Sequence, residues 1–461
     1  MKLTRRKLLI GGGAAAGLAA AGKLGWELLA EATRAPYVRE MALALRDVRA
    51  DAAVEVAFGW IEAGVTREQL LATAFCAQVL SGADRGDPHA QLTPPSIASL
   101  CAAFPEAVED GWLAALWAVQ FSCEWLIDAE PPPPAPAGRG DLESAMRSDD
   151  AVAVDAAVVA AFGARGPHWV VRALAPWTTC ALGDPHTPIL LAQTQAGLRF
   201  LPDDLALPML RSAGRRLCAR AAVPGPGWEE DADAAALYAG RADRSERDGA
   251  IALDIVGLMA AGDDAVTLAQ LPGFVEASSW RAPMIACVLA AAGIMPVASA
   301  SSGMGVHSAT LADALLTLGT VASPLDRALM GRRAVRWFSR LLAAHPGALW
   351  TEELRLKAPP SLDAIEGATD PVNTARAWFR EGGQAPDYTH WLARRGLSPG
   401  QDPHDFKYAA ALMATATLIP ADARAATLSY TAASALATVK RDPWPGAQAA
   451  RLRLRATLGQ S

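Results

Sequence analysis

The chain has 461 residues, which allows two or three ordinary domains or one fused body of two lobes. Hydrophobic residues make up 52% of it and charged residues 20%, so a large apolar core can form. The net charge is −6 and no long basic run occurs, which excludes a nucleic-acid-binding protein.

The first 35 residues are predicted to be an export signal or an N-terminal anchor. Thr4-Arg5-Arg6-Lys7 precedes an uncharged, weakly apolar run (8–22) rich in glycine and alanine. Paired arginines before such a run resemble a twin-arginine signal, and the run is short for a membrane-spanning helix. Ala30-Glu31-Ala32 offers a cleavage site. We therefore expect export by the twin-arginine machinery to the periplasm, with membrane contact only through this segment.

The rest of the chain is predicted to be all-α. Alanine, leucine, glutamate and arginine dominate, and alternating β-branched runs are scarce. Helices are expected at 66–80, 110–127, 203–222, 324–344 and 421–440. Proline-rich or glycine-rich breaks are expected at 130–140, 223–233 and 357–361.

The histidines repeat at a fixed offset. His89 and His307 lie 218 residues apart, as do His186 and His404, while His168 and His390 repeat at 222. Internal repetition sets the architecture of a long chain. We therefore predict an internal duplication, with a first helical lobe at 36–222, a joining segment at 223–245 and a second lobe at 246–461.

Two of these histidines follow Asp-Pro, in Asp184-Pro185-His186 and Asp402-Pro403-His404. Asp is a favoured helix N-cap and Pro is favoured at the first helical position, so each histidine is expected in a first turn. The helix dipole disfavours an imidazolium there, and a neutral imidazole is what a metal ligand or a general base requires. His307 is also expected near a helix start.

His89 precedes Thr93-Pro94, which predicts a helix beginning after the histidine and places His89 in the entering turn. A pseudo-twofold axis between the lobes would bring His89, His186, His307 and His404 to one central pocket.

Two chemistries are open for such a pocket. The four imidazoles could bind iron, zinc or copper, with Asp184, Asp402 or Asp405 as a ligand or an orienting carboxylate. Alternatively, His186 and His404 could act directly as acid–base groups on a small organic substrate, with Lys407 stabilising an anion. A lysine that faces the site would favour the metal-free chemistry, because an ammonium group repels a metal cation.

A non-enzymatic protein is the other possibility: an exported helical binding protein whose histidines cap helices or hold a structural metal or haem. The remaining polar groups have simpler interpretations. His168 and His390 are secondary candidates beside packing tryptophans, and His345 is expected at a helix end. Glu229-Glu230-Asp231 is expected as a solvated helix start. The six cysteines occur singly in apolar segments and contain no C-x-x-C motif, so buried free thiols are expected.

The histidine motifs resemble those of a group of bacterial all-helical proteins. The motifs are His89-Ala90-Gln91-Leu92, Gly183-Asp184-Pro185-His186, Val306-His307-Ser308-Ala309-Thr310 and Asp402-Pro403-His404-Asp405-Phe406-Lys407-Tyr408. The likeness spans about residues 50 to 440, and the group is distantly similar to the questin oxidase-like proteins. Those are helical, histidine-bearing oxygenases that perform Baeyer–Villiger oxygenation of polycyclic aromatic ketones. The resemblance implies an O₂-using oxidoreductase.

Overall fold

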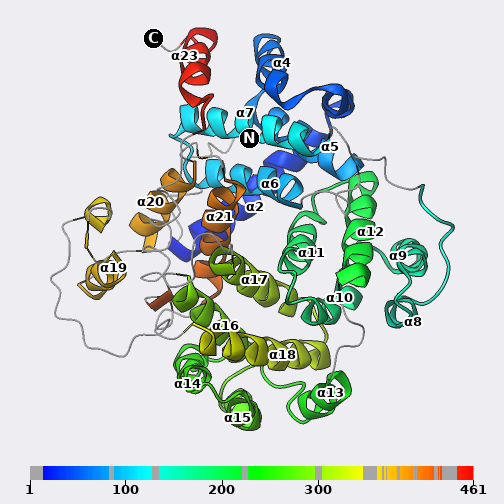
Figure 1. The fold of residues 1–461 in the computed structure, drawn as a ribbon, viewed down its shortest axis with the longest axis vertical. Coiled ribbons are helices and arrows are strands. Elements are labelled where there is room, and N and C mark those ends of the chain that lie inside the picture. Colours follow the sequence, from blue (N-terminus) through cyan, green and yellow to red (C-terminus); the bar gives the residue numbers. More distant parts are fainter. Residues whose placement is uncertain are drawn as a thin grey trace, which may run out of the picture.

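The protein is described here from a computed structural model (Figure 1). It describes residues 14–81, 88–126, 134–220, 227–295, 304–345, 361–365, 368–369, 371–381, 385–397, 400, 402–419, 424, 426–427 and 444–459. The structure is 80% helical, with 21 α-helices and no β-strand in the described part of the chain. The predicted all-α class is confirmed.

The helices of the first half bring α6 and α11 to the centre of the molecule (Figure 1). In chain order they are α2 (Ala14–Thr33), α3 (Pro36–Ala44), α4 (Ala50–Glu62), α5 (Arg67–Ser81), α6 (Pro88–Ala103), α7 (Val108–Leu126), α8 (Leu142–Arg147), α9 (Ala151–Arg165), α10 (Pro167–Leu174), α11 (His186–Gly197) and α12 (Asp203–Arg220).

The helices of the second half bring α17 and α21 to the same place. In chain order they are α13 (Trp228–Ala236), α14 (Asp248–Ala260), α15 (Asp264–Ala277), α16 (Arg281–Ile294), α17 (Met304–Gly319), α18 (Pro324–Ala343), α19 (Pro371–Arg380), α20 (Ala385–Leu397), α21 (Pro403–Leu418) and α23 (Ala447–Thr457). Short 3₁₀ segments lie at Leu45–Asp47, Pro176–Cys180 and Leu362–Ile365.

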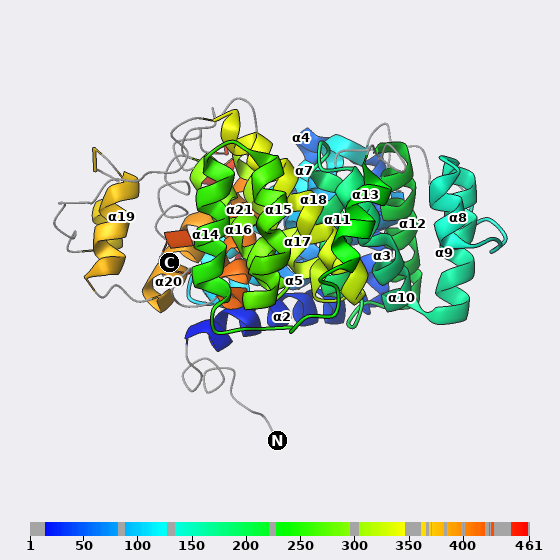
Figure 2. The same cartoon turned by 90° about the horizontal axis from the view of Figure 1, so that it is seen from below.

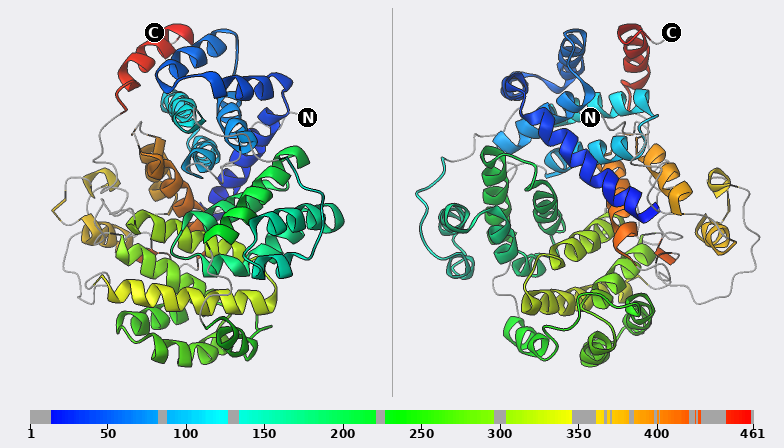
Figure 3. Two further views of the ribbon diagram at one scale, coloured as in Figure 1. Left: turned by 45° about the vertical axis from the view of Figure 1, so that its right-hand side comes forward. Right: turned by 180° about the vertical axis from the view of Figure 1, so that it is seen from behind.

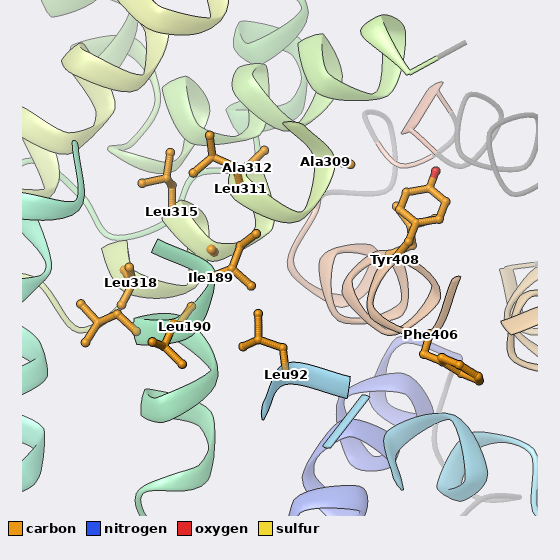
Figure 4. Close-up of a cluster of buried hydrophobic side chains, with 14 of the residues drawn as sticks. Leu92, Ile189, Leu190, Ala309, Leu311, Ala312, Leu315, Leu318, Phe406 and Tyr408 are labelled. Atoms are coloured by element: carbon orange, nitrogen blue, oxygen red, sulfur yellow. The ribbon is translucent and has the colours of Figure 1, made fainter. Parts of the chain in front are cut away.

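Four helices form the centre of the fold. α6 packs on α21, α21 on α17, α17 on α11, and α11 on α6, so the set closes on itself. Figure 4 shows Leu92 of α6, Ile189 and Leu190 of α11, and Leu315 and Leu318 of α17 among the buried apolar side chains between these helices. Two of the four helices come from each predicted lobe. The two-lobed duplication itself stays a prediction.

Helix α2 is part of this body rather than a separate tail in the structure. It packs against α6, α21, α5 and α11, and it runs across the back of the molecule (Figure 3, right) and along its lower side (Figure 2). Trp26, Leu29 and Ala30 are buried, and the Trp26 ring meets Phe75 edge-on at 5.8 Å between ring centroids. No helix in the described part of the chain combines the length and the apolar character needed to cross a bilayer.

Most predicted helices agree with the structure to within two residues at either end. Prediction 66–80 corresponds to α5, 110–127 to α7, 203–222 to α12 and 324–344 to α18. α5 begins with a capping box. The backbone N–H of Gln69 donates to the Thr66 hydroxyl, and the backbone N–H of Thr66 donates to Oε1 of the Gln69 side chain. The helix predicted at 421–440 and the break at 357–361 lie almost entirely outside the described residues.

One expectation about the joining segment is wrong. The acidic cluster does lie in the first turn of α13, with Glu229 and Glu230 exposed. Asp231 is not solvated, because its side chain is fully buried and forms ion pairs with Arg332, Arg333 and Arg336 of α18. These arginines lie about a hundred residues further along the chain. The interaction is therefore tertiary and leaves no local signal in the sequence around Asp231.

Candidate metal centre

The four predicted histidines all lie at helix N-termini. His186 is the first residue of α11, while His89 and His404 are the second residues of α6 and α21. His307 is the fourth residue of α17. At α21 the expected cap is present, since the Asp402 carboxylate accepts a hydrogen bond of 2.8 Å from the His404 amide.

The structure brings the Nε2 atoms of all four rings together. The Nε2–Nε2 distances are 3.1 Å for His89–His186, 2.8 Å for His186–His307, 3.0 Å for His307–His404 and 2.9 Å for His404–His89. We call this set the histidine ring. All four potential ligand atoms lie within 4.8 Å of one another, which is the arrangement that could hold one metal ion.

Hydrogen bonding alone does not account for these contacts. The Nε2 atom of a neutral imidazole carries either one proton or one lone pair in the ring plane. Each of the four atoms can therefore satisfy only one neighbour, and at most two of the four contacts can be good hydrogen bonds. In the other two contacts, about 3 Å long, the proton or lone pair of each nitrogen would already be directed at its other neighbour. A central cation removes this conflict because it accepts all four lone pairs.

The size of the histidine ring fits a metal ion. The centre of a square with these edges lies about 2.1 Å from each nitrogen, and metal–imidazole bonds are about 2.0–2.1 Å. The ring is nearer to a puckered square than to a regular tetrahedron. Neighbouring imidazoles have centroid separations of 4.4–4.6 Å, whereas His89 and His307, on opposite corners, are 5.7 Å apart.

Carboxylates lie beside the Nδ1 atoms of two opposite imidazoles of the histidine ring. Asp402 Oδ1 lies 2.5 Å from Nδ1 of His404, and Asp184 Oδ1 lies 3.4 Å from Nδ1 of His186. Asp184 is also held by the Thr187 hydroxyl at 3.0 Å and by Arg216 at 3.1 Å. A carboxylate that accepts the Nδ1 proton fixes the tautomer with Nε2 free to bind a metal. The predicted orienting role of Asp184 and Asp402 is compatible with this geometry.

The pKa values of His307 and His186 are both lowered. Burial, together with the nearby imidazoles and the Lys407 ammonium, lowers the pKa of His307 to about 2. The pKa of His186 is lowered chiefly by burial, against the opposing effect of the hydrogen bond with Asp184. Burial would raise the pKa of Asp184, but its bonds with His186, Arg216 and Thr187 outweigh burial and lower it. Neutral imidazoles beside an ionised carboxylate are the forms that a metal site needs.

Lys407 lies one helical turn beyond His404 and faces the same side of α21. Its side chain is buried, at 4% exposure, and lines a cavity directly beyond the histidine ring. This orientation is the one that favours metal-free chemistry, because the ammonium would repel a metal ion. The crowding of four Nε2 atoms favours a metal more strongly, and an anion between the ammonium and the ring would remove the repulsion.

Asp405 has surroundings different from those of Asp184 and Asp402. Its Oδ2 atom lies 2.6 Å from the position that a Cβ atom would take at Gly400, so the carboxyl is directed at that loop. Burial raises the pKa of Asp405 to about 7. Its predicted part as a ligand or orienting group stays a prediction.

A cavity of about 270 Å³ is lined by residues of α2, α6, α11, α17 and α21. Most of its wall is apolar or small, with Trp26, Ile189 and Met413 among the larger side chains. The four ring histidines are not among its lining residues, and Ile189, Thr310 and Lys407 line it one helical turn after His186, His307 and His404.

His168 and His345 do not join the ring. His168 is exposed on α10, with Nδ1 3.5 Å from the Gln195 side chain. His345 follows the end of α18 and contacts the Leu341 carbonyl oxygen at 2.8 Å, so the expected helix-end position is confirmed. The side chain of His390 lies outside the described residues. All six cysteines are free thiols, and five are buried.

The helix start predicted at Thr93-Pro94 is wrong. α6 begins at Pro88, and Pro94 and Pro95 lie inside it. Burial on all sides holds the helix together across these prolines, and the Thr93 hydroxyl donates to the His89 carbonyl oxygen at 2.7 Å. The sequence contained a signal for the true start that we overlooked. Asp87-Pro88-His89 is a third Asp-Pro-His triplet, matching those that end at His186 and His404.

Comparisons with protein-family models, with curated proteins and with solved structures found no match to the chain. Any assignment of function therefore rests on the histidine ring and its surroundings.

Proposed function

We propose that this protein binds one transition-metal ion through the Nε2 atoms of His89, His186, His307 and His404. The closure of the ring at Nε2–Nε2 distances of 2.8–3.1 Å is the observation that carries the proposal. Two further features support it. The pKa values of His186 and His307 are lowered, and carboxylates stand behind His186 and His404, as outer-sphere groups stand behind metal-binding histidines in general.

The shape of the ring favours copper, with iron second and zinc third. Tetrahedral zinc with bonds of about 2.0–2.1 Å requires nitrogen–nitrogen distances of about 3.3–3.4 Å, longer than those in the ring. Four nitrogens around a tetragonal metal lie at about 2.9–3.0 Å, and tetragonal nitrogen sites are typical of Cu(II). Imidazole also suits iron, which can take four equatorial nitrogens.

We further propose that the centre serves an oxidoreductase of the oxygenase type acting on a small organic molecule. A bound copper or iron ion would supply one-electron and O₂ chemistry. The adjacent cavity supports a substrate site, and the resemblance of the histidine motifs to those of questin oxidase-like proteins favours oxygenation. The paired arginines at residues 5 and 6 support export by the twin-arginine machinery.

One observation favours a second function, a structural metal in a non-enzymatic binding protein. Structural metal sites use four protein ligands, whereas catalytic sites keep a position open. The histidine ring supplies four protein ligands. The nearby cavity favours the catalytic version, because it would give a substrate a place close to an ion held by the four histidines.

Metal analysis of the purified protein tests the proposal. We expect about one copper or iron ion per chain in the wild type and little metal in His307→Ala and His404→Ala. The control variants His168→Ala and His345→Ala, whose imidazoles lie outside the ring, should keep the wild-type content.

The outcomes separate the possibilities. A tetragonal Cu(II) signal in electron paramagnetic resonance that disappears in His307→Ala would support the redox centre. Stoichiometric zinc would overturn the redox version and favour the structural one. Protein free of metal after growth and reconstitution with copper, iron and zinc would overturn the metal centre and leave direct acid–base chemistry.

A further inference from the structure

The cavity beyond the histidine ring follows the axis of the four central helices. Because residues seven and ten positions after each histidine lie on the same helix face, they form successive layers below the ring. All eight such residues line the cavity. The first layer holds Ser96, Gln193, Ala314 and Ala411, and the second holds Ser99, Ala196, Thr317 and Ala414.

Small side chains in these layers keep the axis open. Seven of the eight residues are Ala, Ser or Thr, so the helices meet without filling the space between them. The only long member, Gln193, is turned to the wall, where its amide donates to the Leu92 carbonyl oxygen at 2.9 Å and to the Ser96 hydroxyl at 3.3 Å. Gly22, Lys23 and Trp26 of α2 line its far end.

The charges along the cavity are mainly positive. Lys407 lies beside the ring, and Lys23 and Arg199 line the far end, where both are exposed. Asp313 is the one acidic residue among the lining residues that the structure describes, and its carboxylate is occupied by the Thr415 hydroxyl at 2.6 Å. The four helix N-termini that meet at the ring add further positive potential at the inner end.

With a metal ion bound in the histidine ring, the inner end of the cavity would have two positive charges close together. A metal ion in the ring and the buried Lys407 ammonium one turn away would repel each other in a medium that screens charge poorly. A negatively charged group between them would be attracted by both. The exposed cations at the far end would raise the local concentration of such a ligand.

We propose that the axial cavity binds a slender organic anion, with its anionic head group beside Lys407 at the histidine end and its carbon chain along the small-residue layers towards Trp26. The inference deepens the proposed function, since it names the class of substrate that would reach the metal.

Calorimetric titration with hexanoate and with 1-hexanol tests the inference. The two probes share a carbon chain and differ in charge. Wild type should bind hexanoate at least tenfold more tightly than 1-hexanol. Lys407→Met should remove this preference. Ala411→Leu, which fills the first layer, should weaken binding of both probes at least tenfold, whereas Ala52→Leu on the exposed face of α4 should leave both unchanged.

Metal content measured in the same samples keeps the two proposals apart. Hexanoate bound with the expected response to Lys407→Met, in protein that takes up no metal, would retain the anion site and overturn the metal centre. Equal affinity for the two probes, or unchanged binding in Ala411→Leu, would overturn the anion site whatever the metal content. Circular dichroism of each variant identifies a loss of binding that comes from unfolding.

Discussion

The side chain of Asp402 contributes two separate contacts to the candidate centre. Its carboxylate accepts from the backbone amide of His404, which caps α21, and it lies 2.5 Å from Nδ1 of the same residue. The first contact stabilises the helix start and the second orients the imidazole. The two can be separated, because asparagine is as good an N-cap as aspartate but carries no charge.

Asp402→Asn should weaken metal affinity about 10–100-fold with little change in thermal stability, because it removes the charged partner of His404 and keeps the cap. The measurement is competitive metal binding against a chelator of known affinity. Asp263→Asn is the matched control, since Asp263 caps α15 by accepting from the Val266 amide and plays no part in the ring. Equal affinity in both variants would contradict an orienting role for Asp402.

Some residue positions in the site could be predicted from the sequence and others could not. The convergence of four histidines followed from the repeat spacing and from Asp-Pro-His as a helix start, and helical periodicity placed Lys407 on the face of His404. The burial of Asp231 could not be predicted, because its three arginine partners lie on α18. The start of α6 was missed because Thr93-Pro94 offered a second, equally plausible cap close by.

At the scale of elements, the four central helices share a layout. His89, His186 and His404 each precede a proline by 16 residues (Pro105, Pro202 and Pro420), and His307 precedes Pro324 by 17. A second helix begins near that proline in the described cases, as α7, α12 and α18. The histidines are spaced 97, 121 and 97 residues apart. The described pairs α6–α7, α11–α12 and α17–α18 therefore share one layout, and the two-lobed duplication stays a prediction.

Helix α2 depends on one glycine for its close approach to α6. A Cβ atom at Gly25 would lie 2.5 Å from the Ser99 amide nitrogen and 2.6 Å from the Ser99 Cα, so backbone would have to move. A Cβ atom at Gly22, one turn earlier on the same helix, would meet nothing within 4 Å.

Gly25→Ala should therefore destabilise the full-length chain by about 1–3 kcal/mol through overpacking. Gly22→Ala should be neutral or stabilising by up to about 1 kcal/mol, because alanine favours a helix over glycine. Thermal denaturation of the two variants beside the wild type checks this pair. A chain in which neither substitution changes stability would show that α2 is not packed on α6 in solution.

At the scale of the whole molecule, the histidine ring joins helices from both ends of the chain. His89 and His404 are 315 residues apart in sequence and 2.9 Å apart at Nε2. A metal ion held by all four rings would cross-link four helices from the two halves of the chain. Its binding free energy would therefore add to the stability of the folded chain.

Removal of the metal by a chelator should lower the melting temperature by several degrees, because an ion present at a thousandfold excess over its Kd contributes about 4 kcal/mol. Differential scanning calorimetry of the protein before and after dialysis against the chelator measures the shift. The His307→Ala variant should melt at the same temperature in both conditions. An unchanged wild-type melting temperature after dialysis against the chelator would show that no tightly held ion links the helices.

The distance along the chain between His89 and His404 has a consequence for how the site is assembled during synthesis. At about 5–20 residues per second, His404 leaves the ribosome roughly 15–60 seconds after His89. Throughout that interval a growing chain can present one, two or three of the imidazoles but never the closed ring. The complete set of ligands thus exists only on the nearly finished polypeptide, so selection of the ion would be a late event in biogenesis, and an incomplete set of three is the state most open to capture of the wrong ion.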